Sequence, residues 1–77
     1  MNDQDKILEK IEALIDQTTE LREKSFLSQK QVATILGLSS HASIHAIEKK
    51  KTMPRLDTIL KILSVYGYTL KIVPDEK

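Results

Sequence analysis

Residues 27–51, LSQKQVATILGLSSHASIHAIEKKK, decide the fold of this 77-residue chain. The stretch holds two short segments whose apolar residues recur at helical spacing, and Gly37 stands between them. Glycine adopts a left-handed backbone conformation at little cost, which suits the end of a helix. The pattern therefore predicts two helices joined by a turn.

The first of these helices is predicted from about Ser28 to Leu36. The Ser28 hydroxyl can accept a hydrogen bond from a free amide of the first turn, and Gln31, three residues later, completes a capping-box pattern. Leu38 is expected to plug the turn that follows Gly37. The inner face of the helix is expected to consist of Val32, Ala33, Ile35 and Leu36.

The second helix is predicted to start at Ser39 or Ser40, and either hydroxyl can cap it. Ile44 and Ile47 are three residues apart, so they form its inner face. A helix that lies in the major groove of DNA needs small polar side chains on its outer face, apolar side chains on its inner face and cations at its end. The outer face carries such side chains, namely His41, Ser43, His45 and Lys49.

Charge is segregated along the chain, although the formal net charge is only +1. Residues 1–27 balance at −3, residues 28–55 at +4 and residues 56–77 at zero. A basic middle segment is a weak signal by itself, but it is the electrostatic footprint expected of a nucleic-acid-binding protein. Its cations are Lys30, Lys49, Lys50, Lys51 and Arg55.

A long amphipathic helix is predicted before this region, from Asp3 to about Lys24. At roughly six turns it exceeds what one small domain usually covers. Two interpretations stay open: its N-terminal part packs on a partner chain, or it frays or lies on its own domain. The apolar stripe consists of Ile7, Leu8, Ile11, Leu14, Ile15 and Leu21, with Thr18 in the one gap.

A further helix and a strand are predicted after the basic segment. Pro54 favours a helix start, and the apolar spacing continues from Leu56 to Tyr66, where Gly67 ends the helix. Residues 68–73, YTLKIV, alternate and predict a strand that Pro74 ends. A lone strand needs a partner, and we expect the same strand of a second copy to supply it. The dimerisation residues would be Tyr68, Leu70 and Ile72.

Composition sets outer limits on the class of protein. Hydrophobic residues make up 40% and charged residues 30%, which is typical of a globular protein. The absence of cysteine excludes disulfides and thiolate metal sites. No apolar run is long enough to cross a bilayer and no signal peptide is recognisable, so we expect a cytoplasmic protein located at the nucleoid. So short a chain buries a modest core, and an oligomer is expected to supply part of it.

One set of positions between residues 22 and 73 matches a known pattern. On these residues the chain resembles the Cro/CI-type (XRE) helix-turn-helix family. The Gly67-Tyr68 step and the closing strand are similar to the antitoxin branch of type II toxin–antitoxin systems. The matching positions are Leu27, Ser28, Gln29, Val32, Ala33, Leu36, Gly37, Leu38, Ser39, Ile44, Ile47, Glu48, Pro54, Leu56, Thr58 and Ile59.

The resemblance implies an all-α fold, a lambda-repressor-like helix-turn-helix bundle of about four helices. One short C-terminal β-strand would pair across a dimer. We expect the N-terminal helix over residues 1–24 to be part of this domain and a possible partner contact. The DNA-binding core would cover residues 25–67, and the strand and tail residues 68–77.

Two departures from the family pattern bear on the site. In family members, the glutamate that ends the recognition helix is commonly one residue nearer to the turn glycine than Glu48 is to Gly37 in this chain. Either the turn is longer or the helix starts a residue early, which leaves open which of three residues, His41, Ala42 and Ser43, faces the bases. In addition, Arg55 stands where the family often has a small polar cap.

The resemblance and the charge pattern together predict a DNA-binding site. Sequence choice would come from the outer face of the recognition helix, and phosphate contacts from its flanks. Gln29 would bond a phosphate or clamp a base-reading side chain. Ser39 and Ser40 could equally serve only as helix caps, and Lys49 and Lys50 could be no more than the solvated end of the helix. The predicted residues are Gln29, Lys30, Ser39, Ser40, His41, Ser43, His45, Lys49 and Lys50.

Catalysis and metal binding find no support in the sequence. No nucleophile stands in a recognisable elbow, no glycine-rich phosphate loop is present, and the carboxylates are scattered. His41 and His45 share a helical face, but neither a further ligand nor an HExxH pattern accompanies them. We therefore expect no enzyme activity, no cofactor and no metal.

The predicted function is a homodimeric, sequence-specific DNA-binding repressor that reads a palindromic operator. The antitoxin-like tail implies a second role, in which the protein binds a toxin through its acidic N-terminal helix and represses the operon that they share. Two alternatives stay open: a protein-interaction module with little DNA specificity, and a phage-type repressor without a toxin.

Overall fold

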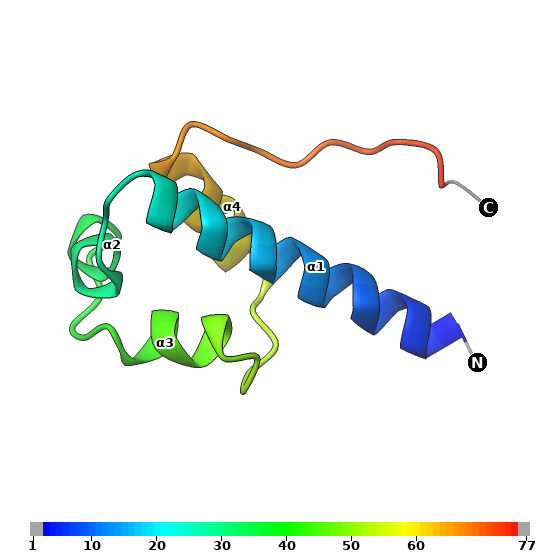
Figure 1. The fold of residues 1–77 in the computed structure, drawn as a ribbon, viewed down its shortest axis with the longest axis horizontal. Coiled ribbons are helices and arrows are strands. Elements are labelled where there is room, and N and C mark those ends of the chain that lie inside the picture. Colours follow the sequence, from blue (N-terminus) through cyan, green and yellow to red (C-terminus); the bar gives the residue numbers. More distant parts are fainter. Residues whose placement is uncertain (1–2, 76–77) are drawn as a thin grey trace.

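A computed structural model describes residues 3–75 of the chain. Within this range the fold is all-α, with four helices: α1 (Asp3–Lys24), α2 (Gln29–Ile35), α3 (Ala42–Glu48) and α4 (Leu56–Val65). Figure 1 shows α2 nearly end-on while α3 lies in the plane of the view, so these two helices cross steeply. No helix of the described part combines the length and the apolar character that crossing a membrane requires.

The core lies where the C-terminal half of α1 meets the three short helices. Val32 has no exposed surface, and Ile44 and Ile47 are 3% and 6% exposed. These side chains are the inner faces that the apolar spacing predicted for α2 and α3. The buried cluster consists of Ile15, Val32, Ala33, Ile44, Ile47 and Ile62, and Ile11, Leu27, Leu36 and Tyr66 pack against it.

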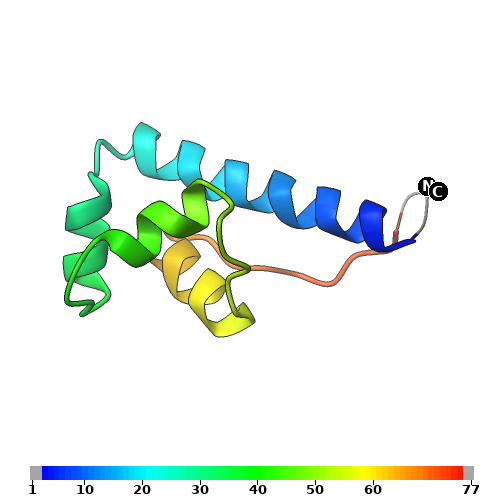
Figure 2. The ribbon, with the colours of Figure 1, turned by 90° about the horizontal axis from the view of Figure 1, so that it is seen from below.

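The long first helix is confirmed, and its two halves have different surroundings. In the C-terminal half, Thr18 is buried and its hydroxyl donates to the carbonyl oxygen of Ile15 at 2.8 Å. The one polar side chain in the apolar stripe therefore has its hydrogen-bond partner within the helix. In the N-terminal half, Ile7 and Leu8 are 56% and 45% exposed. A helix of 22 residues is about 33 Å long, so α1 projects beyond the short helices (Figure 2).

The start and the end of α2 follow the sequence prediction. The Gln31 amide donates to the Ser28 hydroxyl at 3.0 Å, and the Ser28 amide donates to the Gln31 side-chain oxygen at 2.8 Å. Gly37 has a φ of +75°, which is the left-handed conformation expected after the helix. Leu38 does not plug the turn fully, since 41% of it is exposed.

The prediction that Ile35 belongs to the inner face of α2 is wrong, because Ile35 is 58% exposed. The inner direction is set by Val32, Ala33 and Leu36, which are buried or half-buried. At 100° per residue, Ile35 lies to the side of that direction. A helix of seven residues is too short for periodicity alone to separate its flank from its face.

The extra residue bears on both the turn between α2 and α3 and the start of α3. The third helix begins at Ala42, so residues 38–41 form the connection after Gly37. The prediction that Ser39 or Ser40 is the N-cap of this helix is wrong, because the N-cap is His41, whose side chain makes no capping hydrogen bond. The Ser40 hydroxyl, one residue earlier, accepts from the Ala42 amide at 3.2 Å. The extra residue thus lies between Gly37 and the end of α3, in a connection of four residues followed by a helix of seven.

Two helices end at non-glycine residues whose backbone is in the left-handed conformation. Phe26 (φ 58°) follows α1 and Lys50 (φ 61°) follows α3. At both ends the two backbone hydrogen bonds of a Schellman motif close the helix, Leu27 N–H to the Arg22 carbonyl at 3.2 Å being one of them. Such a position usually favours glycine, because a Cβ there costs about 1–2 kcal/mol.

The predicted strand over residues 68–73 is not formed within one chain. Residues 68–75 carry neither helix nor strand in the described range, and they run back along α1 (Figures 1 and 2). The Lys10 ammonium and the Asp75 carboxylate, 2.9 Å apart, join the far end of this segment to α1. The physical reason is that the described chain offers no second strand to complete a ladder.

We expect Phe26→Gly to raise the free energy of unfolding by about 1 kcal/mol, because glycine relieves the left-handed strain while losing somewhat more backbone entropy. The side chain is 92% exposed, so little packing is lost. Chemical denaturation measures the change. Phe26→Ala is the control: it keeps the strain and should change stability by less than about 0.5 kcal/mol. A glycine variant less stable than the alanine variant would contradict the explanation.

Candidate nucleic-acid interface

One carboxylate joins three helices behind the predicted recognition helix. Glu48, the last residue of α3, accepts from Arg22 Nε at 2.7 Å and from Arg22 Nη2 at 2.9 Å. It also accepts from the Gln29 side-chain amide at 2.9 Å. Arg22 Nη1 donates to the Leu27 carbonyl oxygen at 2.9 Å, which ties the same guanidinium to the segment before α2. The end of α3 is thereby fixed to α1 and to the start of α2.

The pair is largely withdrawn from water, because the two side chains are only 15% (Arg22) and 10% (Glu48) exposed. Burial raises the pKa of the Glu48 carboxyl, but the hydrogen bonds from Arg22 and Gln29 outweigh it and leave the pKa below its ordinary value. The hydrogen bond to Glu48 raises the pKa of the Arg22 guanidinium. Both groups are therefore charged at neutral pH, and the bidentate geometry fixes the angle of α3.

Sequence reasoning included Glu48 only as a matching position and missed Arg22. The two residues are 26 positions apart, and no local pattern connects them. Gln29 was predicted to bond a phosphate or to clamp a base-reading side chain. In the structure its amide donates to Glu48, which ends the recognition helix, so at least one of its amide hydrogens is engaged inside the protein.

The four side chains predicted on the outer face of α3, together with Ala42, are exposed: His41, Ala42, Ser43, His45 and Lys49. Two surface hollows lie near the helix, one beside the turn that precedes it and one along its α4 side. One groove lies toward α2 and is lined by Lys30, Thr34 and the turn with Ser39, Ser40 and His41. The other lies toward the start of α4, where Ser43 faces Pro54 and Arg55. The outer side of the helix is therefore accessible at His41, Ala42, Ser43, His45 and Lys49.

The basic residues around α3 differ in what they already contact. Lys30, Lys49 and Lys51 are exposed. Lys50 is different, because its ammonium is 2.8 Å from the Asp16 carboxylate of α1. The hydrogen bond to Asp16 raises the pKa of this ammonium. The lysine run is thus split: Lys50 turns back to α1, while its two neighbours remain exposed.

The structure brings no metal site together around the two histidines. His41 and His45 are exposed, and the carboxylate of Glu48, the last residue of α3, is held by Arg22 and Gln29. Residues 3–75 contain no group of three or more histidine, cysteine, aspartate or glutamate side chains placed to hold a metal ion.

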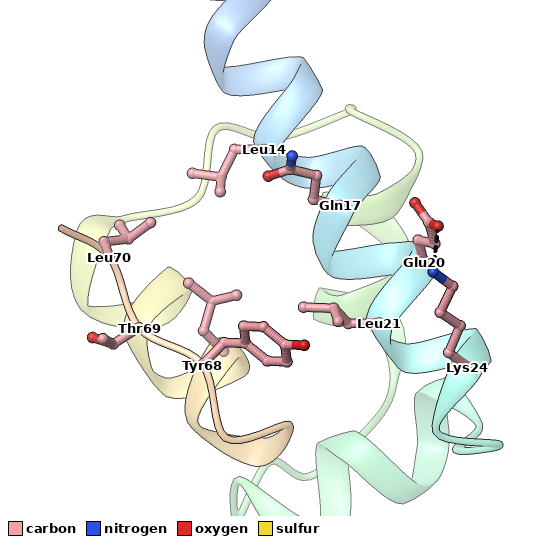
Figure 3. A pocket seen from close by; sticks show the side chains of 9 residues that line it. Leu14, Gln17, Glu20, Leu21, Lys24, Tyr68, Thr69 and Leu70 are labelled. Atoms are coloured by element: carbon pink, nitrogen blue, oxygen red, sulfur yellow. Dashed lines mark ion pairs between the residues drawn. The ribbon is translucent and has the colours of Figure 1, made fainter. Parts of the chain in front are cut away.

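The C-terminal segment that contains the predicted dimerisation residues runs on the far side of α1 from α3 (Figure 1). Tyr68 and Leu70 face Leu14 and Leu21 of α1 across a groove of about 320 Å³, with Gln17, Glu20, Lys24, Leu63 and Thr69 completing its walls (Figure 3). Ile72 contacts almost nothing, since 98% of it is exposed. The apolar side chains of the tail are only partly covered by their own chain.

The chain is similar in sequence to proteins of a known family. A family model described as helix-turn-helix (HTH_3) matches residues 19–73, so the chain belongs to the helix-turn-helix family. It is 44% identical over 62 residues to an uncharacterized HTH-type transcriptional regulator of Haemophilus influenzae, covering 80% of this chain. It is 40% identical over 52 residues to the HTH-type transcriptional regulator PuuR of Escherichia coli, covering 68% of this chain.

These relatives are longer than the region that they share with the chain. The match spans 62% of the Haemophilus influenzae protein and 28% of PuuR, so the chain covers less than two thirds of either relative. No solved structure matches the chain.

We expect Arg22→Met to lower the free energy of unfolding by about 2–4 kcal/mol at pH 7, because it leaves the Glu48 carboxylate withdrawn from water without its cation. The folded-state pKa of Glu48 lies below its ordinary value of about 4.5. The pair therefore stabilises the wild type fully above that pH, and the contribution is lost as the pH falls through the folded value. Denaturation at pH 7 and at pH 3 measures both stabilities.

The difference between the two proteins should narrow at the lower pH, since protonated Glu48 no longer needs the guanidinium. Glu20→Gln is the control, because its ion pair with Lys24 is exposed and should contribute less than about 1 kcal/mol. A gap between wild type and Arg22→Met that is equal at both pH values would contradict the role given to Glu48.

Proposed function

We propose that this protein is a sequence-specific DNA-binding transcriptional repressor that acts as a homodimer. The observation that carries the proposal is the exposed α3, fixed at its end by Glu48 and followed by exposed lysines. Membership of the helix-turn-helix family supports it, and so do relatives named as transcriptional regulators. Recognition in such a fold comes from a helix that enters the major groove.

In the proposed complex, α3 lies in the major groove, where His41, Ser43 and His45 contact base edges. Phosphates on either side of the groove would meet the flanking donors, which are Gln29, Lys30, Ser39, Ser40, Lys49 and Lys50. The groove toward α2 places Lys30 beside the turn serines, which supports a common phosphate path there. Lys50 is the weakest of these assignments, since it would first have to leave Asp16.

Dimerisation through the tail is the second part of the proposal. Tyr68, Leu70 and Ile72 would pair with the same residues of a second copy as a two-stranded sheet. The partial exposure of these side chains supports this, and so does the extended course of residues 68–75. The tail lies on the far side of α1 from α3, so pairing would leave α3 free (Figure 1). Two such helices would then read the half-sites of a palindromic operator.

An antitoxin role is the finer form of the proposal. The N-terminal half of α1 exposes Ile7 and Leu8 among acidic side chains, and this surface favours contact with another protein. In that role the protein would neutralise a toxin and repress the operon that encodes both. The same exposed surface supports the second candidate, a protein-interaction module with little DNA specificity. A phage-type repressor without a toxin would need only the DNA-binding part.

The decisive experiment is selection of bound sites from a random duplex pool at near-physiological salt. We expect a palindrome whose half-sites lie about one helical turn, 34–36 Å, apart. His45→Ala should then lose preference at one position of each half-site, while Glu9→Ala, an exposed change on α1, should recover the wild-type motif. Recovery of no motif would contradict sequence-specific binding and favour the interaction module.

Salt dependence distinguishes the lysines. We expect Lys49→Ala to weaken binding on all sequences and to reduce the slope of log K against log salt by about 0.9, the loss of one phosphate contact. Lys50→Ala should change the slope less, because its ammonium is engaged by Asp16. Titrations at several salt concentrations measure both slopes. Equal slopes for the wild type and Lys49→Ala would show that this lysine meets no phosphate.

The tail prediction is tested by sedimentation. Deletion of residues 68–77 should convert a dimer to a monomer, with the helical circular dichroism signal retained. Ile72→Lys is a milder variant: the side chain is 98% exposed within one chain, so its effect on monomer folding should be small while it disrupts pairing. A deletion variant that remains a tight dimer would rule out pairing through this strand.

A further inference from the structure

The outermost line of α3 overlaps only in part with the face that the sequence suggested. Ile44 and Ile47 point into the core, at 3% and 6% exposure, and they fix the rotation of the helix. At 100° per residue, the direction opposite to them passes close to Ala42 and to Lys49, the residue after the helix. Ala46 and His45 lie about 50° to either side of that direction. Ser43 lies on the flank, where it lines the groove toward Pro54.

The other flank of α3 is occupied by a contact within the protein. Glu48 lies there and is held by Arg22 and Gln29, so it is not free to turn toward a ligand. A helix that enters a groove with this rotation presents the Ala42 methyl group at its centre, with the Ala46 methyl group on the α4 side and His45 on the other side. Ala42 is exposed and Ala46 is half-exposed, and both line the open groove on the α4 side.

An alanine methyl group neither donates nor accepts a hydrogen bond. In the major groove, the apolar feature that a base pair offers is the C5-methyl group of thymine. A guanine or cytosine edge against these side chains would lose its water without gaining a partner, which is unfavourable. The short side chains also allow the helix backbone to approach the groove floor closely.

We infer that Ala42 and Ala46 are specificity-determining residues that select thymine by contact with its methyl group. The inference rests on the proposed function and adds the base class that this face selects. Cβ atoms one turn apart on a helix are about 5–6 Å from each other, and successive bases of a strand rise by about 3.4 Å. The two contacts therefore fall on thymines one or two steps apart in each half-site, next to the base that meets His45.

Replacement of thymine by deoxyuridine tests the inference, because it removes the methyl group alone. The duplex is the motif recovered by the selection, and each thymine of one half-site is replaced in turn. We expect binding by the wild type to weaken about three- to tenfold at one or two thymines and to stay unchanged at the others. Titration at one fixed salt concentration gives the ratio of the two dissociation constants at each position.

Ala42→Gly and Ala46→Gly should each abolish the deoxyuridine penalty at one thymine and leave the other penalty intact. Glycine weakens a short helix, so Ala42→Ser and Ala46→Ser form a second set that keeps the Cβ atom and the helix. Here the hydroxyl displaces the apolar contact, and the penalty should fall as well. Ala13→Gly, an exposed change on α1, is the matched control and should keep both penalties.

Two results would overturn the inference while leaving the proposed function in place. One is a recovered palindrome whose half-sites contain no thymine, and the other is a palindrome that binds equally well with deoxyuridine at every position. Failure to recover any motif would overturn the inference together with the proposed function.

Discussion

The ion pair between Arg22 and Glu48 is the constraint on which the rest of the structure depends. A helix of seven residues such as α3 does not hold its own shape in water, so its position must come from its neighbours. Ile44 and Ile47 anchor one face of α3 in the core, and the bidentate contact fixes its end to α1. Since Gln29 donates to the same carboxylate, the start of α2 is set by the same contact.

Several polar side chains near α3 are used within the fold, and this decides which of them remain for a ligand. Lys50 pairs with Asp16 while it ends α3 in a left-handed conformation. The Ser40 hydroxyl accepts from the Ala42 amide at the start of that helix. What remains exposed on α3 and at its ends is a set of small and basic side chains, namely His41, Ala42, Ser43, His45 and Lys49.

A second surface lies on the other side of α1, and it is independent of the first. The tail over residues 68–75 covers part of an apolar groove but leaves its own side chains largely exposed. Because α1 separates this surface from α3, both can be occupied at the same time (Figure 1). The two surfaces are therefore separate in the described fold (Figure 1).

The sequence by itself determined the helices and, except for Ile35, the inner faces of α2 and α3, because apolar spacing and capping residues act locally. Ser28, Gln31 and Gly37 marked the limits of α2, and Ile44 and Ile47 marked the core side of α3. Tertiary structure alone decided what depends on distant partners. The contact of Glu48 with Arg22, the pairing of Lys50 with Asp16 and the absence of a ladder for residues 68–73 follow from how α1 lies against the rest of the chain. No local pattern carries that information, since hydrogen-bond partners far apart in sequence meet only once the core has packed.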